Sequence, residues 1–377
     1  MSHNTLVILG AGASSPLPLT QELTDGLLAQ ADPNTGFELN KWISETVLGV
    51  STFEDIMDCL ADAAIAITKD TPLPSWTLPL EERLPEGHTL LGVCRFGFIN
   101  AAHYIEIALV DAQRRIALNA ASYQATICNE LSVGSGGRLV IATLNYDDSV
   151  LDGSTAFYDG FDHKRDTALF DDGFSERVRL QSKALLWLHG CTHFNINGGA
   201  NRLQDMPLGQ VFWDGDACRA AHEWSGAVRA GRLDLPLVIG ADKPRQILRR
   251  PFINYWATLS DFATVVDRLV VIGYSGGDDH LNYILEDIVM RRGENLKVVI
   301  GTKAKSWEQA LATLRKIFPG LFNPYSLPNC QPASPRASLR QVLSVPVATL
   351  PKVWVDLDGI EDLAKPETLA KLIEVLQ

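Results

Sequence analysis

The sequence predicts an α/β fold built on a doubly wound parallel sheet, and three observations lead to this class. Four apolar runs each end in glycine or polar residues: 6–14, 141–147, 185–190 and 269–282. Buried parallel strands have this pattern where they lead into loops at their carboxyl ends. Helical periodicity separates the runs, as in a Rossmann-like sheet. A hydrophobic content of 46% fits a sizeable core.

The length of 377 residues favours one large domain with insertions, or two domains. We predict a main domain over residues 1–305, a helical insertion at about 35–135, and a C-terminal extension over 306–377. No run of eighteen apolar residues and no signal-peptide pattern is present, which predicts a cytoplasmic protein without membrane contact.

The elements follow in chain order. Residues 5–10 form the first strand, and Thr20 can cap a helix over 21–30. In the insertion, apolar residues at 53, 56, 57, 60, 64 and 67 share one helical face and indicate a core stripe. The proline-rich residues 71–88 are expected to be irregular.

The remaining elements follow from the same patterns. We expect further strands at 139–144, 184–188, 235–239, 269–272 and 296–300. We expect helices at 251–267, 283–292, about 306–317 and about 365–376, and a proline-rich connector at 324–335. We expect two polar excursions from the main sheet, one with short strands at 152–183 and a second at 195–232.

Two properties of the composition bound the function. The net charge of −12 leaves no large basic footprint, so we expect no direct nucleic-acid binding. The cysteines contain no C-x-x-C pair, so a cysteine-based zinc site has no local signature and no metal is expected.

The first strand leads directly into a glycine-rich segment, Gly10-Ala11-Gly12-Ala13-Ser14. Glycines let a backbone turn sharply and approach a phosphate closely. A tight turn without a ligand explains the same residues, because the spacing is not G-x-G-x-x-G.

Polar residues end the next strands. Asn145 can donate and accept hydrogen bonds at once, and a neutral His189 can act as a base toward a hydroxyl. Asn145 and Asp147 also suit an Asx-turn, and a lone histidine at a strand end is more often structural. His193 lacks the further ligands of a metal site, and Asp278 is better explained as a helix cap.

Taken in order, the four motifs resemble the SIR2-like, sirtuin-related domains of bacterial anti-phage defence systems. The matching segments are GAGAS-x-P, T-x-N-Y-D, L-H-G and V-I-G-Y-S-x-x-D-x-H-L-N, and the resemblance covers roughly residues 1–300. It does not extend to the helical insertion or the last 70 residues.

The resemblance implies an NAD⁺ site. Residues Gly10 to Ser14 would hold the pyrophosphate, and Asn145 and Asp147 would lie around the nicotinamide and its ribose. His189 would contact that ribose as a base. Gly273, Tyr274 and Ser275 would lie near the adenosine half. Asp278 would either support these residues without touching the ligand or lie beside the adenosine.

Two departures weaken a deacylase interpretation. Deacylating sirtuins carry a zinc module with two C-x-x-C pairs and continue the first motif into G-I-P-D-F-R. This chain has neither, and reads Pro16-Leu-Pro-Leu-Thr20. The sequence therefore favours an NAD⁺ glycohydrolase that depletes NAD⁺. The alternatives are a sensor that binds NAD⁺ or ADP-ribose without turnover, and a zinc-free deacylase or ADP-ribosyltransferase.

The resemblance also implies partners. Related defence proteins act as homo-oligomers, and those without a fused sensor pair with a HerA-like ATPase or a short Argonaute protein. We expect a homo-oligomer with one of these partners.

Overall fold

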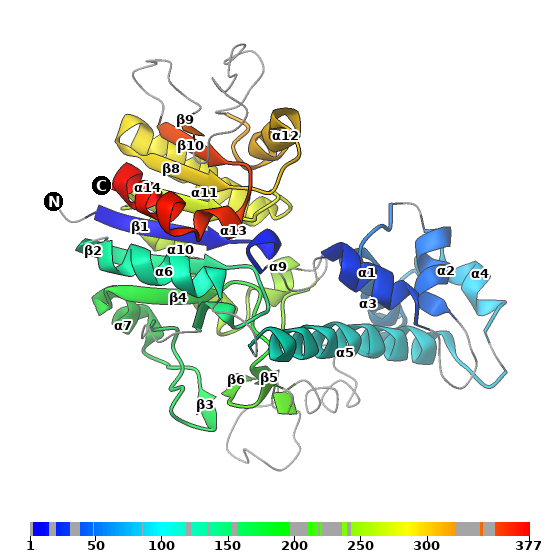
Figure 1. Cartoon of the computed structure of the whole chain (residues 1–377). Coiled ribbons are helices and arrows are strands. Elements are labelled where there is room, and N and C mark those ends of the chain that lie inside the picture. The colour runs from blue at the N-terminus through cyan, green and yellow to red at the C-terminus, as the bar shows by residue number, and fades with distance from the viewer. Residues whose placement is uncertain are drawn as a thin grey trace.

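We describe the chain from a computed structural model (Figure 1). It describes residues 3–14, 20–30, 38–47, 49–84, 86–117, 122–134, 136–151, 157–196, 210–217, 219–220, 236–239, 243–320, 340–341 and 351–377. The predicted connector at 324–335 lies outside these residues.

The main sheet has seven strands in the order β4-β2-β1-β7-β8-β10-β9. Neighbouring strands are parallel except β10 and β9, which confirms the expected parallel α/β class. The strands are β1 His3–Leu9, β2 Gly136–Thr143, β4 Lys183–Trp187, β7 Arg268–Ile272, β8 Lys297–Gly301, β9 Arg340–Gln341 and β10 Lys352–Asp356.

The strand order reverses between β1 and β7. From β1 the chain adds β2 and β4 on one side, then crosses to β7 and adds β8 and β10 on the other. Residues Leu6, Val7, Ile8 and Leu9 of β1 are fully buried, as a central strand requires. Ligands bind at such a reversal in open α/β sheets, outside the carboxyl ends of the strands.

Helices cover both faces of the sheet, which makes it doubly wound (Figure 1). One layer consists of α6 Tyr123–Gly134, α13 Ile360–Leu363 and α14 Pro366–Leu376. The other contains α7 Phe174–Leu180, α10 Phe252–Ala263, α11 Asp279–Arg292 and α12 Trp307–Ile317.

A helical unit projects to one side of the sheet (Figure 1). Its helices are α1 Thr20–Leu28, α2 Leu39–Thr46, α3 Phe53–Lys69, α4 Thr77–Glu81 and α5 Leu90–Ala117. It differs from the insertion predicted at about 35–135, because α1 belongs to it and α6 packs on the main sheet. The predicted stripe on α3 is confirmed, since Phe53, Ile56, Met57 and Leu60 are at most 2% exposed. They belong to a hydrophobic core separate from that of the sheet.

A small antiparallel sheet lies beside the main one. Its strands are β3 Thr167–Leu169, β6 Val211–Asp214 and β5 Phe194–Ile196, in that order. β3 lies in the first predicted polar excursion, at 152–183, and β6 lies in the second, at 195–232, while β5 begins one residue before the second.

Three sequence predictions need correction. The strand expected at 235–239 is wrong for residues 236–239, which are buried but irregular, while Leu235 lies outside the described residues. There the Ile239 backbone exchanges hydrogen bonds with the side chain of Gln246 instead of a neighbouring strand. The expected irregular segment 71–88 contains α4. The C-terminal segment adds β10 to the main sheet, beside β8.

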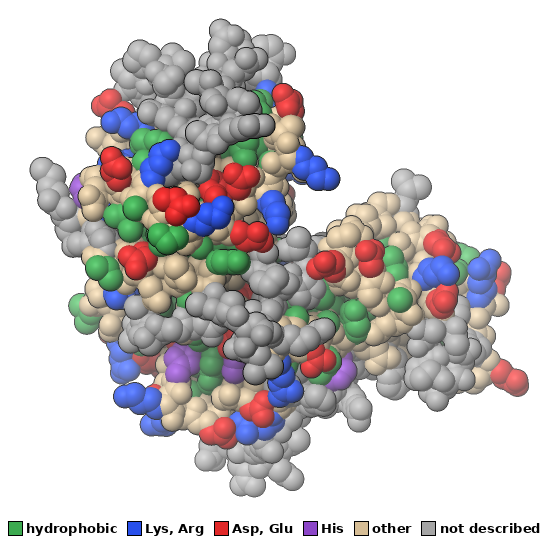
Figure 2. Space-filling view, in the orientation of Figure 1, with side chains coloured by type: hydrophobic (Ala, Val, Ile, Leu, Met, Phe, Trp, Pro, Cys, Tyr) green, Lys and Arg blue, Asp and Glu red, His purple; other side chains and the backbone are tan. Residues whose placement is uncertain are grey.

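Charged side chains of both signs are interspersed on the face shown in Figure 2. Within the described residues, no helix has the length and apolar character needed to cross a membrane.

Gly273 offers a test of the contact between the loops that follow β1 and β7. Its φ is +65°, and an added Cβ would lie 2.1 Å from the Ala13 backbone nitrogen. We therefore expect Gly273→Ala to lower the free energy of unfolding by about 2 kcal/mol or more. The matched control is Gly277→Ala, where an added Cβ meets no atom closer than 3.7 Å. Equal urea midpoints for both variants would contradict this account.

Candidate functional site

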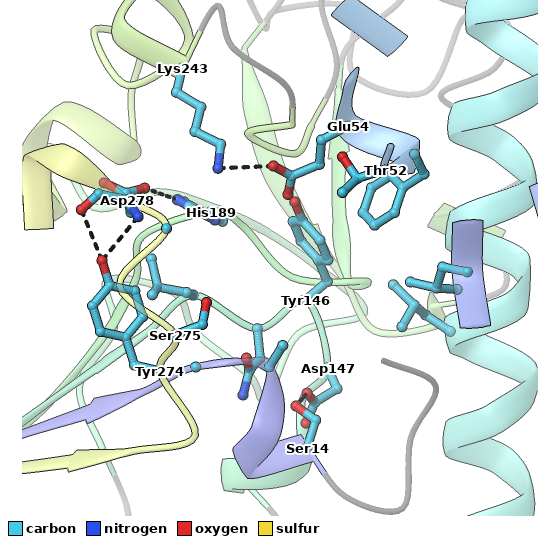
Figure 3. Close-up of a pocket in the computed structure, with 18 residues that line it drawn as sticks. Ser14, Thr52, Glu54, Tyr146, Asp147, His189, Lys243, Tyr274, Ser275 and Asp278 are labelled. Carbon is cyan, nitrogen blue, oxygen red and sulfur yellow. Dashed lines mark hydrogen bonds and ion pairs between the residues drawn. The ribbon is translucent and has the colours of Figure 1, made fainter. Parts of the chain in front are cut away.

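A cavity of about 300 Å³ lies at the carboxyl ends of β1, β2 and β7, next to the helical unit (Figure 3). Its volume is at the lower end of the range for small-molecule sites. Most of the predicted site residues line it: Gly10, Ala11, Ser14, Asn145, Asp147, His189, Tyr274, Ser275 and Asp278. The cavity occupies the reversal in strand order, where a ligand site is expected.

The other predicted residues, Gly12, Ala13 and Gly273, support the cavity without being among the described residues that line it. The Gly12 amide donates to the Gly273 carbonyl at 2.9 Å, and the Gly10 amide donates to the Ile272 carbonyl at 2.9 Å. A Cβ on Gly10 would lie 2.6 Å from the Cα of Tyr274. These glycines are needed for close contact between two loops, whatever they do for a ligand.

Asn145 is the most unusual side chain in the cavity wall. It is only 5% exposed, and its backbone amide donates to the Thr143 hydroxyl at 3.1 Å. Neither its side-chain nitrogen nor its side-chain oxygen has a hydrogen-bond partner within the described part of the chain. Leaving a buried amide unpaired costs about 1–3 kcal/mol. The arrangement therefore fits a group that a ligand or water satisfies.

His189 is held by a carboxylate. Its Nε2 lies 3.0 Å from Oδ2 of Asp278, and both side chains are buried (Figure 3). Burial raises the pKa of Asp278, but the hydrogen bond and charge of His189 outweigh it and bring the pKa to about 2. Asp278 is thus an ionised acceptor, so Nε2 carries the proton and Nδ1 is the basic nitrogen.

Burial also lowers the pKa of His189, although the hydrogen bond that the ring donates to Asp278 opposes this effect. The ring is therefore neutral at pH 7. That state is the one that a base toward a hydroxyl group requires.

Asp278 connects this pair to a helix. Its Oδ1 accepts from the Leu281 amide at 3.2 Å and caps α11, which confirms the predicted capping role. The Tyr274 hydroxyl accepts from the Asp278 amide at 3.0 Å and lies 2.8 Å from Oδ1 of Asn282. Both Asp278 oxygens are engaged by the protein, so the carboxylate acts on His189.

Asp147 joins two of the predicted motifs. The Ser14 hydroxyl donates to its Oδ2, and the Gln124 side chain donates to its Oδ1 at 3.1 Å. Burial raises the pKa of Asp147, while the hydrogen bonds from Ser14 and Ser149 oppose that rise. Asp147 therefore ties the loop after β1 to the loop after β2, and its contact with a ligand stays a prediction.

Sequence reasoning missed part of the wall. Thr52, Phe53, Glu54 and Leu109 come from the helical unit, and Lys243 comes from α9 Lys243–Gln246. None of them lies in a strand-end motif. The signal available was the length of the insertion, which places a second structural unit beside the carboxyl ends of the strands.

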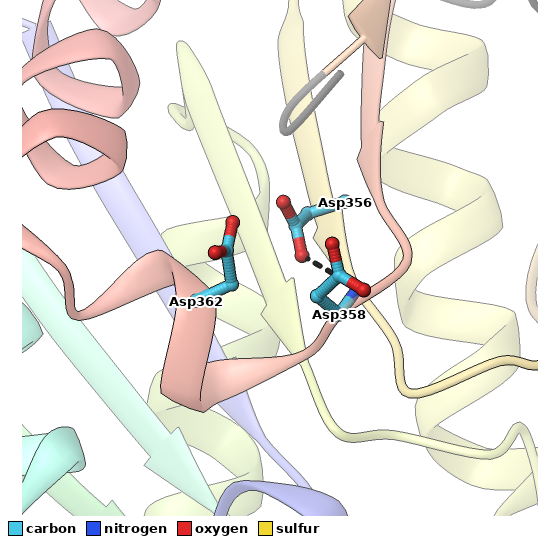
Figure 4. A group of neighbouring side chains, drawn as sticks. All are labelled: Asp356, Asp358 and Asp362. Atoms are coloured by element: carbon cyan, nitrogen blue, oxygen red, sulfur yellow. Dashed lines mark hydrogen bonds between the residues drawn. The ribbon is translucent and has the colours of Figure 1, made fainter. Parts of the chain in front are cut away.

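Two acidic groups outside the cavity have structural partners. Asp356, Asp358 and Asp362 lie within 4.8 Å of one another (Figure 4). Asp356 accepts from the backbone of Asp358 at 2.9 Å, and Lys365 pairs with Asp362 at 2.7 Å. His193 pairs with Asp148 at 3.0 Å. These contacts explain the side chains as turn and ion-pair residues, and the expectation of no metal stays a prediction.

Comparison with known proteins adds little to this geometry. No family model matches the chain, and no curated protein matches it. A solved structure described as "Structural Basis for the Mechanism and Regulation of Sir2 Enzymes" is similar at 12% identity, covering 84% of each chain with a TM-score of 0.33. So low a score supports no conclusion on function. The fold class rests on the strand order above.

The His189–Asp278 pair predicts a pH response. We expect Asp278→Asn to lower the pKa of His189 further below its ordinary value of 6.5, because the carboxylate opposes the effect of burial. A depressed folded-state pKa contributes stability that is present above pH 6.5 and lost as the pH falls through the folded value. In the variant the loss should therefore begin near the same pH but continue to lower pH and become larger.

Imidazole NMR titration measures this change directly. His193 is the internal control: burial lowers its pKa, but the hydrogen bond to Asp148 outweighs burial and leaves the pKa raised. Asp278→Asn should leave the His193 titration unchanged. An unaltered His189 titration would show that the carboxylate does not govern the ring.

Proposed function

We propose that the chain is an NAD⁺ glycohydrolase that cleaves the bond between nicotinamide and ribose, giving nicotinamide and ADP-ribose. The observation that carries the proposal is the side-chain amide of Asn145, which has no hydrogen-bond partner among the described residues and is buried in a cavity that His189 also lines. An amide that can donate and accept suits a ribose hydroxyl, a carboxamide or a water. The resemblance of the four motifs to SIR2-like domains supplies NAD⁺ as the molecule that offers these groups.

The reaction places modest demands on the protein. The bond between C1′ and the pyridinium nitrogen breaks, and its electron pair leaves with a neutral nicotinamide. C1′ becomes oxocarbenium-like and takes the oxygen of a water, whose proton passes to solvent or to a base. The protein must position the ribose and the water and supply fitting electrostatics.

The described residues match these demands. Asn145 can orient the ribose or the water through its side-chain nitrogen and oxygen, which have no partner within the described part of the chain. Neutral His189 can accept a proton at Nδ1 because Nε2 is committed to Asp278. Apolar side chains of Phe53, Leu109 and Leu144 form part of the wall.

Substitution of the two central residues tests the proposal. We expect Asn145→Ala and His189→Ala each to reduce nicotinamide release by about 100-fold or more, since loss of an orienting donor or a base has effects of that size. Circular dichroism should show an intact fold, because both side chains line a cavity. The control is His88→Ala, an exposed histidine of the helical unit.

The products separate the alternatives when wild-type protein receives NAD⁺ with and without an acetylated peptide. Free ADP-ribose without peptide supports hydrolysis. Binding without any product indicates a sensor, and turnover only with peptide indicates deacylation or ADP-ribosyl transfer. If both variants release nicotinamide at the wild-type rate, Asn145 and His189 take no part in the mechanism.

We further propose that the enzyme acts as a homo-oligomer in anti-phage defence, with a HerA-like ATPase or a short Argonaute as partner. The motif resemblance supports this, and so does the exposure of Tyr283 and Met290, two turns apart on α11, at 73% and 75%. Light scattering should report a mass above 41.3 kDa at micromolar concentration. A fully active monomer would contradict the proposal.

A further inference from the structure

An ion pair crosses the cavity where the helical unit meets the sheet domain. Nζ of Lys243 lies 3.2 Å from Oε2 of Glu54, and the two side chains are 17% and 31% exposed. Glu54 belongs to the first turn of α3 and Lys243 begins α9. Figure 3 shows the pair beside His189 and Tyr146.

Lys243 is the only lysine or arginine among the described residues that line the cavity, whereas Glu54, Asp147 and Asp278 are acidic. Two of these acids are occupied inside the protein. Asp147 accepts from Ser14 and Gln124, and Asp278 accepts from His189. The Glu54–Lys243 pair is thus the charge contact of the wall that a ligand can exchange.

Hydrogen bonds made by neighbouring residues hold Lys243 in position. Gln246, on the same short helix, exchanges hydrogen bonds of 2.8 and 2.7 Å with the backbone of Ile239. The neighbouring Val238 amide donates to the His189 carbonyl at 2.8 Å. The ammonium group is therefore held near His189, and its charge contributes to lowering the pKa of both His189 and Asp278, behind the larger effects of burial and their mutual hydrogen bond.

We propose that Lys243 is the phosphate-binding side chain of this cavity. A phosphate group of the ligand replaces Glu54 as the ion-pair partner of its ammonium group. An anionic ligand meets a wall with an excess of carboxylates, so it needs a cation. A lysine ammonium is a compact charge well suited to phosphate oxygens. Glu54 is 31% exposed, so its carboxylate keeps contact with water when the lysine changes partner. Only the identity of the ligand as a dinucleotide rests on the proposed function.

The competing explanation is that the pair only bridges α3 and α9. The two accounts differ in the sign of one effect. If Lys243 binds phosphate, Glu54→Gln frees it and strengthens phosphate binding, whereas Lys243→Met weakens it. If the pair is only a bridge, both variants break the same contact and weaken binding alike.

Isothermal titration of the full chain with inorganic pyrophosphate and with ADP-ribose tests this. We expect Lys243→Met to raise the Kd for both probes about tenfold or more, the usual size of a charge-assisted hydrogen bond. Glu54→Gln should lower both Kd values several-fold. The matched control is Lys303→Met, which removes an ion-paired lysine that is 74% exposed and should leave both Kd values unchanged.

The outcomes separate this inference from the proposed function. Equal loss in both cavity variants, or no change in either, overturns the role of Lys243 even if the wild type cleaves NAD⁺. No binding of pyrophosphate to the wild type also overturns it. Pyrophosphate binding that depends on Lys243 in a protein that neither binds nor cleaves NAD⁺ supports the inference and refutes the glycohydrolase.

Discussion

The loops that follow β1 and β7 lie backbone against backbone, and the cavity depends on that contact. The Gly12 amide reaches the Gly273 carbonyl at 2.9 Å, while the Gly273 amide donates to the Gly301 carbonyl at 2.8 Å. Side chains at Gly10 or Gly273 would force the loops apart. Because β7 is adjacent to β1, the chain that leaves β7 carries Tyr274 and Asp278 over the same edge of the sheet.

The contact also explains how one carboxylate serves two elements. Oδ1 of Asp278 caps α11, and Oδ2 accepts a hydrogen bond from the imidazole of His189. His189 follows β4, which lies on the opposite side of β1 from β7 in the strand order. The position of the helix and the protonation state of the ring are thereby coupled. A shift of the loop after β7 would change both at once, so the packing of the glycines influences the chemistry of a residue that they do not contact.

The main strands and the convergence of their ends were predictable from sequence, because buried parallel strands are locally apolar and their topology brings their ends together. The rest depends on contacts distant in sequence. Residues 236–239 have the apolar character of a strand, but Gln246 and Tyr146 satisfy their backbone. Glu54 and Lys243 lie in no motif, and they meet only because the helical unit folds against the carboxyl ends of the strands.

The wall combines paired charges with an unpaired amide, and the two features have different consequences. Glu54 is paired with Lys243, Asp278 accepts a hydrogen bond from His189, and burial raises the pKa of Asp147. The side-chain amide of Asn145 has no such partner among the residues that the structure describes, although it is as buried as Asp147 and His189. A buried amide without partners costs free energy, and a ligand or water that supplies the hydrogen bonds recovers it. A ligand with a hydroxyl or carboxamide at Asn145 and an anionic group at Lys243 would satisfy both features at once.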